Sequence, residues 1–397
     1  MKNLKLLFTF LFAVCLLNIT NAQIAVKGGV VYTSAGDPIK DGVVLIKNGK
    51  IERVGKQSSV KIPTNYEVLE AAVVTPGLID AHSVVGLAGM YNVPADQDQL
   101  ETSSAIQPEL RAIDAYNARE ELVAHLRNLG VTTVHTGHGP GALISGQTMI
   151  VKTTGNTVDE SVLVPQKMLA FTLGSMINGA IKKPGTRAKG IAMLRQELLK
   201  AQAYAKKRAA KDNNQSTSLD MEALADLLDG KLTALVTVHK ANDIMSAIRL
   251  QKEFGFPMIL DGVAEAYLIL DEIKASGLSV IVHPSMVRTN GDSKNASMET
   301  PAKLYAAGIP FAFQSGYEAY VPKTRVVLFE AGVAVGNGLD HDVAVQKLTI
   351  DAAKMLDIDK RVGSLEKGKD ADVVLYDGDP FEYTSHVTNV IINGVKQ

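Results

Sequence analysis

The segment VVTPGLIDAHSVVGLAG, residues 73 to 89, carries two side chains with chemical potential at the end of an apolar run. Asp80 and His82 follow a Pro-Gly turn, and the next position on the same face of a strand is Val84. Two neutral imidazoles on one strand face are a common way to hold a catalytic metal ion. The segment therefore indicates either a metal-dependent hydrolase or a chain that kept the frame of one and lost the ion.

Further polar residues stand where other predicted strands end. Five of the eight histidines fall at such ends, whereas His125, His341 and His386 fall elsewhere and are interpreted as structural. Lys152 and Asp261 occupy two more of these strand ends. The predicted pocket residues are Asp80, His82, His135, His138, His239, Asp243, His283, Gln314 and Ser315.

Three of these imidazoles, on His82, His239 and His283, would point into one site from different strands and form the candidate metal-ligand set. The alternative is that each histidine caps a strand or lines a ligand pocket. His135 and His138 lie in a glycine-rich turn and are interpreted as loop or pocket residues. The cofactor is therefore either a divalent ion of the zinc type or none, and the residues leave both open.

The middle of the chain alternates strand and helix patterns, for example LTALVTVH followed by ANDIMSAIRLQKEFG. Repeated units of this kind indicate a parallel sheet, and their number favours a (β/α)8 TIM-type barrel over residues 76–362. An open doubly wound sheet is the alternative, but no glycine-rich phosphate fingerprint follows the first strand. Catalytic residues of such a barrel would lie at the carboxyl ends of its strands.

Both ends of the chain carry tight hairpin signals, Asn48-Gly49 and Asn393-Gly394, between short β patterns. We therefore predict that residues 23–75 and 363–397 pair into one small composite β-sandwich domain, with the barrel inserted between them.

Residues 1–22 resemble a cleaved secretory signal, with Lys2 and Lys5 ahead of an apolar run and Thr20-Asn21-Ala22 behind it. A membrane anchor is the alternative, but the run from Leu6 to Leu17 is shorter than the roughly 20 residues of a spanning helix. We predict a periplasmic or extracellular protein. Cys15, the only cysteine, lies in this segment, so the remainder has no thiol chemistry. The formal net charge of -1 argues against nucleic-acid binding.

Four segments together resemble the amidohydrolase superfamily, in its imidazolonepropionase-like branch. They are PGLIDAHS, GVTTVHTGHGPGALISGQTMIVK, VTVHKANDIMSAIRLQKEFG and RVGSLEKGKDADVVLYDGDP, in the order of the family. The resemblance implies a metal-bearing barrel beside a small β domain. It also implies hydrolysis of a non-peptide carbon-nitrogen bond, in a cyclic amide or a small amide.

The ligand positions that the resemblance implies are mostly replaced. The first-strand pair becomes His82 and Val84, the fifth-strand ligand falls near Thr237, and the sixth falls near Gly262. The aspartate of the eighth strand falls at Ser315 or Gly316. With one clear ligand of four, metal-assisted hydrolysis should be weakened or lost.

Two hypotheses follow. The first is a hydrolase with a reduced or rebuilt metal site. The second is a non-catalytic protein that binds a small molecule or serves as the partner subunit of an active amidohydrolase; a homo-oligomer is a further expectation from the resemblance. The loops expected to select a ligand, residues 90–114 and 286–299, carry no specific motif.

Overall fold

The computed structural model describes residues 23–397 except 92, 182–183, 211–215, 286–290 and 317–326. The predicted signal segment, residues 1–22, lies outside the described residues, as does part of the loop at 286–299. Within the described part, no helix is both long and apolar enough to cross a lipid bilayer.

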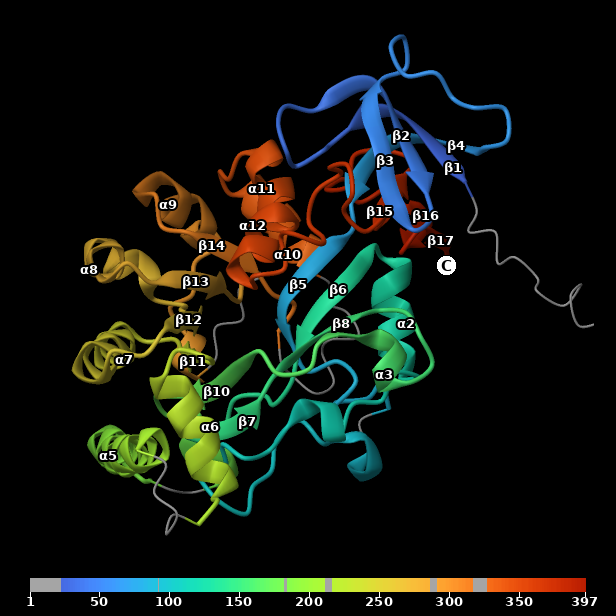
Figure 1. Cartoon of the computed structure of the whole chain (residues 1–397). Helices are drawn as coiled ribbons and strands as arrows, with labels where there is room; N and C mark the ends of the chain where they lie inside the picture. The colour runs from blue at the N-terminus through green and yellow to red at the C-terminus, as the bar shows by residue number, and fades with distance from the viewer. Residues whose placement is uncertain (1–22, 92, 182–183, 211–215, 286–290, 317–326) are drawn as a thin grey trace, which may run out of the picture.

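Strands from both ends of the described chain form one seven-stranded sheet, in the order β17-β16-β15-β4-β1-β2-β3 (Figure 1). Strand β15 from the C-terminal end pairs antiparallel with β4 from the N-terminal end. The bounds are β1 Ile24–Val31, β2 Ile39–Lys47, β3 Lys50–Lys56, β4 Glu67–Pro76, β15 Val373–Tyr376, β16 Val387–Ile392 and β17 Val395–Lys396. The predicted pairing of the two chain ends within one sheet is therefore observed.

Two hairpins of this sheet turn at the predicted Asn-Gly pairs. Asn48 and Gly49 have φ of 53° and 76°, and Asn393 and Gly394 have φ of 53° and 75°. Positive φ at both central residues defines the primed turn whose twist matches that of the flanking strands. Asparagine and glycine adopt this conformation at low cost, which explains both sequences.

The remaining strands form a six-stranded sheet, β14-β13-β12-β11-β10-β7, and a four-stranded sheet, β5-β6-β8-β9. Their bounds are β5 Leu78–Ser83, β6 Val131–Thr136, β7 Ile144–Gln147, β8 Met149–Lys152, β9 Val162–Val164, β10 Met168–Thr172, β11 Thr233–Val238, β12 Met258–Gly262, β13 Ser279–Val282 and β14 Phe311–Phe313. Strands β10 to β14 are mutually parallel.

A closed barrel of eight parallel strands is not confirmed. Strand β7 runs antiparallel to β10, and β8 runs antiparallel to β6, so the segment between them departs from the predicted strand-helix repeat. At the other side, a parallel bridge between Ser83 and Gly316 joins the end of β5 to the segment after β14. The fold shown is a mixed α/β fold consistent with a TIM-type barrel.

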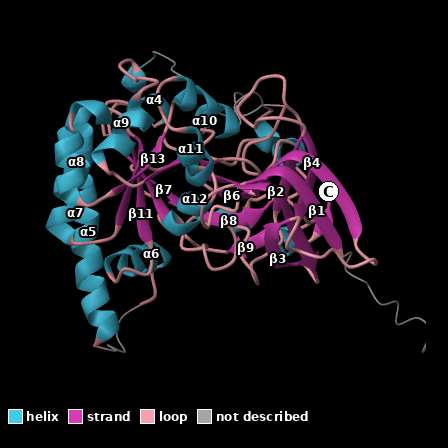
Figure 2. Cartoon of the chain, turned by 90° about the horizontal axis from the view of Figure 1, so that it is seen from above, coloured by secondary structure: helices cyan, strands magenta, loops and turns pink. Residues whose placement is uncertain are grey.

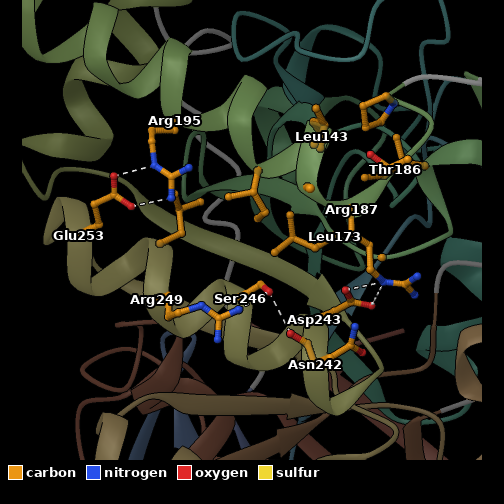
Figure 3. A pocket seen from close by; sticks show the side chains of 17 residues that line it. Leu143, Leu173, Thr186, Arg187, Arg195, Asn242, Asp243, Ser246, Arg249 and Glu253 are labelled. Atoms are coloured by element: carbon orange, nitrogen blue, oxygen red, sulfur yellow. Dashed lines mark hydrogen bonds and ion pairs between the residues drawn. The ribbon is translucent and has the colours of Figure 1, made fainter.

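Helices cover the outer side of the six-stranded sheet (Figure 2). The α-helices are α2 Glu121–Asn128, α3 Val158–Ser161, α4 Ile177–Ala180, α5 Arg187–Ala209, α6 Leu219–Leu228, α7 Ala241–Phe254, α8 Leu270–Ser276, α9 Thr300–Ala307, α10 Val327–Gly336, α11 His341–Lys347 and α12 Ile350–Met355. Helix α7 ends at Gly255, in the left-handed conformation that glycine favours at a helix end. Helices α5 and α7 are joined by an ion pair between Arg195 and Glu253 (Figure 3).

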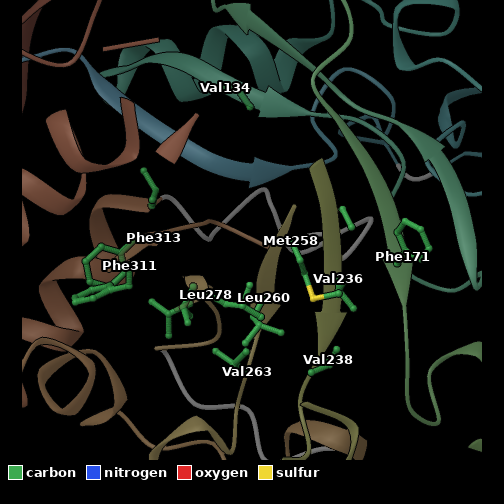
Figure 4. Packing of buried hydrophobic residues seen from close by; sticks show 14 of the residues in the cluster. Val134, Phe171, Val236, Val238, Met258, Leu260, Val263, Leu278, Phe311 and Phe313 are labelled. Carbon is green, nitrogen blue, oxygen red and sulfur yellow. The ribbon is translucent and has the colours of Figure 1, made fainter. Parts of the chain in front are cut away.

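The two faces of the six-stranded sheet enter different apolar clusters. Val236 and Leu260 face outward and pack with helix residues such as Ile244 of α7 (Figure 4). Leu235 and Ile259, one position earlier, face inward, since successive side chains of a strand point to opposite faces. The inner apolar cluster comprises Ile79, Ala81, Ile150, Met168, Leu235, Ile259, Ile281 and Ala312, with α12 residues Ala352, Ala353 and Leu356 among those closing it.

Candidate active site in the mouth of the parallel strands

The inner face of the parallel strands changes from apolar to polar toward the carboxyl ends. This polar end, with His82, Asp261 and Gln314, is called the mouth below. On the four strands β11 to β14, the alternation of the strand places a polar side chain two residues beyond an apolar side chain of the inner cluster. The successions are Leu235 to Thr237 to His239, Ile259 to Asp261, Ile281 to His283, and Ala312 to Gln314. This regularity brings the predicted pocket residues His239, His283 and Gln314 to one end of the sheet.

Asp261 is the centre of the buried polar group. Its carboxylate accepts hydrogen bonds from the Thr237 hydroxyl, at 2.6 Å, and from the Gln314 side-chain amide. Nδ1 of His82 lies 3.2 Å from Oδ2 of Asp261. Burial alone would raise the pKa of Asp261, but the charge and hydrogen bonding of His82, with the Thr237 hydrogen bond, hold that pKa below its ordinary value. Asp261 is therefore ionised near neutral pH.

Asp80 connects β5 to the segment after β14. Its carboxylate accepts a hydrogen bond from the Ser315 backbone N–H at 3.0 Å and another from the Ser315 hydroxyl. The backbone N–H of His82 donates to the same carboxylate at 3.3 Å. Burial raises the pKa of Asp80 to about 6, although these hydrogen bonds oppose the shift. The polar groups of Asp80 and Ser315 therefore hold β5 to the segment after β14 and are not available to a ligand.

His135 lies beside His82, with ring centroids 5.9 Å apart. Its Nδ1 donates to the carbonyl of Ala81 at 2.7 Å, which fixes the tautomer, and Nε2 accepts from the Thr148 hydroxyl at 2.6 Å. Burial is the main cause that lowers the pKa of His135 to about 3. The ring is therefore a neutral support for the backbone next to His82.

His239 occupies space that the family pattern would give to another residue. Gly262 has φ of +83°, and a Cβ added there would lie 2.6 Å from Cε1 of His239. The imidazole of His239 therefore blocks the sixth-strand position where a metal ligand was expected. On the next strand, Nδ1 of His283 lies 3.8 Å from the buried carboxylate of Glu330, which also accepts from the Ser285 backbone N–H.

Three residues singled out in the sequence lie in other surroundings. Asp243 lies in the first turn of α7 and pairs with Arg187 of α5, with the guanidinium Nε 2.8 Å from Oδ1. His138 lines a separate cavity of about 300 Å³, and neither of its ring nitrogens has a hydrogen-bond partner among the described residues. Lys152 donates to Asp370 at 2.8 Å and to other groups near β15, so it is a structural lysine.

The side chains of the mouth do not fit the family's metal-ligand set. Val84 is fully buried and apolar, Thr237 is bound to Asp261, Gly262 faces His239, and Ser315 is bound to Asp80. Among the residues that the structure describes, no group of three or more His, Cys, Asp or Glu side chains is arranged to hold a metal ion. The set of His82, His239 and His283 therefore stays a prediction without support from ligand geometry.

The sequence interpretation did not select the centre of the site. The sequence places Asp261 at a strand end, but the predicted pocket residues do not include it, and Thr237 is predicted only as a replaced ligand position. The available signal was the alternation along β12, which places Asp261 on the inner face two residues after Ile259. No sequence pattern points to Glu330, because it lies on helix α10 and reaches His283 only once the chain has folded.

Comparisons with known proteins agree with this architecture. A sequence model of the amidohydrolase family matches residues 314–396. The crystal structure of an amidohydrolase from Thermotoga maritima MSB8 superimposes with a TM-score of 0.87 and 30% identity, covering 94% of this chain and 99% of that one.

Two curated relatives align along most of the chain. The imidazolonepropionase of Fusobacterium nucleatum is 22% identical over 402 residues, covering 89% of this chain and 91% of that protein. Amidohydrolase tasK of Hapsidospora irregularis is 22% identical over 392 residues, covering 90% of this chain, which spans 40% of the length of tasK. The chain therefore belongs to the amidohydrolase superfamily, in its imidazolonepropionase-like branch.

Proposed function

We propose that this protein is an exported member of the superfamily that binds a small amide-type ligand in the mouth of its parallel strands without metal-assisted hydrolysis. The family's reaction needs an ion that polarises the carbonyl and lowers the pKa of bound water. The observation that carries the proposal is the Asp261 carboxylate, which stands against the retained ligand His82 and is already engaged by Thr237 and Gln314.

The mouth retains groups suited to binding a polar molecule. The side-chain oxygen of Gln314 is buried and has no hydrogen-bond partner among the described residues, so it is an acceptor suited to a ligand N–H group, while its NH2 group is held by Asp261. The fixed neutral ring of His135 holds the backbone beside His82 in place. An amide presents one donor and one acceptor in a fixed plane, which supports this ligand class together with the family resemblance.

A weakened metal hydrolase is the second candidate. Both His82 and His239 interact electrostatically with Asp261 and help to lower its pKa, so these three residues are the part of the mouth nearest to a ligand set. In that case a metal would have to displace the hydrogen bonds of Asp261 before binding.

Two finer features of the fold also belong to the proposal. We propose that β7 and β8 complete a closed barrel. This is supported by the pairing of β7 with β10, by the pairing of β8 with β6, and by the bridge between Ser83 and Gly316. We also propose that the seven-stranded sheet is the core of a separate domain, residues 23–75 and 363–397. Export rests on residues 1–22, and a partner amidohydrolase or a homo-oligomer stays a prediction.

The test combines turnover and binding. Purified mature protein is incubated with zinc, manganese or iron and assayed on a panel of cyclic amides and dipeptides, while thermal shift detects binding of the same compounds. We expect saturable binding of at least one compound and no metal-dependent turnover. Metal-dependent hydrolysis that is lost in His82→Ala and kept in the control His386→Ala, a largely exposed histidine, would overturn the proposal.

A further inference from the structure

A cavity of about 550 Å³ opens between helices α5 and α7, on the outer side of the strands (Figure 3). Its volume falls in the range of pockets that hold small organic molecules. The residues that line it include none of the mouth group around Asp261, so it is a separate site.

The floor of this cavity between α5 and α7, called the flank cavity below, is apolar. Leu143, Leu173, Ile177 and Leu250 line it, and all four are at least nine-tenths buried. They come from the residue before β7, the residue after β10, α4 and α7, so the floor is built by elements that the fold holds together. A hydrocarbon or aromatic group placed on this floor would be removed from water, which is favourable in proportion to the area buried.

Two ion pairs span the cavity from α5 to α7. Arg187 donates to both carboxylate oxygens of Asp243, at 2.8 and 3.0 Å. Arg195 forms a two-bond pair with Glu253, at 2.7 and 2.8 Å. The two arginines are eight residues apart on α5, about 12 Å along the helix axis. The ion pairs therefore join the two helices at two points, with the ligand-sized opening between them.

Arg249 is the third arginine that lines the cavity, and it takes no part in these two ion pairs. It lies on α7 within the lining and donates to the hydroxyl of Ser246 at 2.8 Å, and that hydroxyl donates to the Asn242 carbonyl at 2.9 Å. Among the described residues Arg249 has no carboxylate partner, since Glu253, one turn further along α7, is engaged by Arg195. A guanidinium has five N–H donors, so most of those on Arg249 face solvent or the cavity.

The charge is unevenly distributed along the cavity. Arg187 faces Asp243 and also lies 3.8 Å from Asp292, whose carboxylate is fixed by Ser175. That end therefore holds two carboxylates for one guanidinium, and an anion would be repelled there. Arg249 is the position where an anionic group gains a partner without competing with a protein carboxylate.

We propose that the flank cavity binds an amphipathic carboxylate, such as a medium-chain or aryl-alkyl acid. Its carboxylate pairs with Arg249 in the two-bond geometry that guanidinium favours, and its apolar part lies on the leucine and isoleucine floor. This site is independent of the ligand proposed for the mouth.

The test uses octanoate as the anionic probe and octan-1-ol as its uncharged counterpart, with binding to the full mature protein followed by calorimetry. Arg249→Gln is compared with Lys252→Gln, which removes the same charge from an exposed position of α7 outside the lining. We expect Arg249→Gln to weaken octanoate binding by roughly tenfold or more, equivalent to about 1.4 kcal/mol, and Lys252→Gln to leave it unchanged. Neither variant should alter octan-1-ol binding.

A third variant locates the site. Ala188 is an exposed residue of α5 in the lining, and Ala188→Trp should fill the opening and abolish binding of both probes, with circular dichroism confirming the fold. Absence of saturable octanoate binding to the parent protein overturns the proposal. Equal loss in Arg249→Gln and Lys252→Gln also overturns it, because the attraction would then be general charge. Neither outcome bears on the ligand of the mouth.

Discussion

Nδ1 of His82 lies 3.2 Å from Oδ2 of Asp261, so the imidazole at the end of β5 faces a buried carboxylate of β12. Both residues are almost completely inaccessible to solvent. An ion bound to His82 would have to compete with the contacts that Asp261 already makes with His82, Thr237 and Gln314. This relationship links β5 to β12 and gives the mouth a polar core of its own.

Asp261→Asn should destabilise the protein. The change removes the charge that His82 and Thr237 stabilise, and it turns a donor toward groups that are themselves donors. We expect a loss of roughly 2–4 kcal/mol in the free energy of unfolding, measured by urea denaturation. Asp271→Asn, at an exposed position of α8, is the control and should change stability by less than about 1 kcal/mol. Equal effects of the two variants would show that Asp261 is not a structural centre.

Gly262→Ala tests the contact with His239. Gly262 and Gly277 both have positive φ, but a Cβ at Gly277 would meet nothing within 4 Å, whereas at Gly262 it would meet the His239 ring. Gly277→Ala should therefore lower the free energy of unfolding by only about 1 kcal/mol, because alanine is strained in the left-handed conformation. Gly262→Ala should cost roughly 2–4 kcal/mol, because the ring must move as well. Thermal denaturation of the pair gives the difference directly, and similar losses would contradict the blocked position.

Lys152→Met should loosen the junction between the central strands and the seven-stranded sheet. The buried ammonium of Lys152 contacts Asp370 and Asp372, both of which are buried, and its removal leaves Asp372 without its cation. We expect a loss of roughly 3–5 kcal/mol in unfolding free energy. The control Lys167→Met removes a pair with the exposed Asp357 and should cost less than about 1 kcal/mol. A ranking in the opposite order would refute the structural role of Lys152.

His138 should make stability depend on pH in the mildly acidic range. Burial lowers its pKa from 6.5 to about 4, so below pH 6.5 the unfolded chain takes up a proton that the folded protein does not. Stability therefore falls as the pH drops from 6.5 to about 4, by about 1.4 kcal/mol per pH unit for this group, and levels off below that range.

His138→Gln removes that proton-linked contribution. The buried His135, with its own lowered pKa, retains its share, so the slope in the variant should be smaller but not zero. Urea denaturation between pH 5 and pH 7 measures both slopes. Identical slopes in the two proteins would mean that His138 is protonated equally in the folded and unfolded states.

Local patterns predicted much of the fold. The Asn-Gly pairs specified both hairpins, because their conformation depends on two residues. The helix over ANDIMSAIRLQKEFG and the strands before and after it also agree with the structure, since apolar spacing and a terminal glycine act locally. The antiparallel course of β7 and β8 was not predicted, because strand direction depends on pairing with distant strands.

The site was predicted by position rather than by partner. In the structure His239, His283 and Gln314 directly follow the ends of the parallel strands β11, β13 and β14. It could not show that Asp243, only four residues after His239, turns outward to Arg187 on α5. Nor could it show that Gly262 faces an imidazole, because that contact depends on the relative placement of β11 and β12.

We propose that the mouth does not hold a metal ion through the ligand positions of the family. Elemental analysis of the purified mature protein tests it most directly, after dialysis and again after incubation with zinc, manganese or iron followed by removal of free ion. We expect no stoichiometric metal under any of these conditions and no change in His82→Ala. Near-stoichiometric retained metal that disappears in His82→Ala would contradict it.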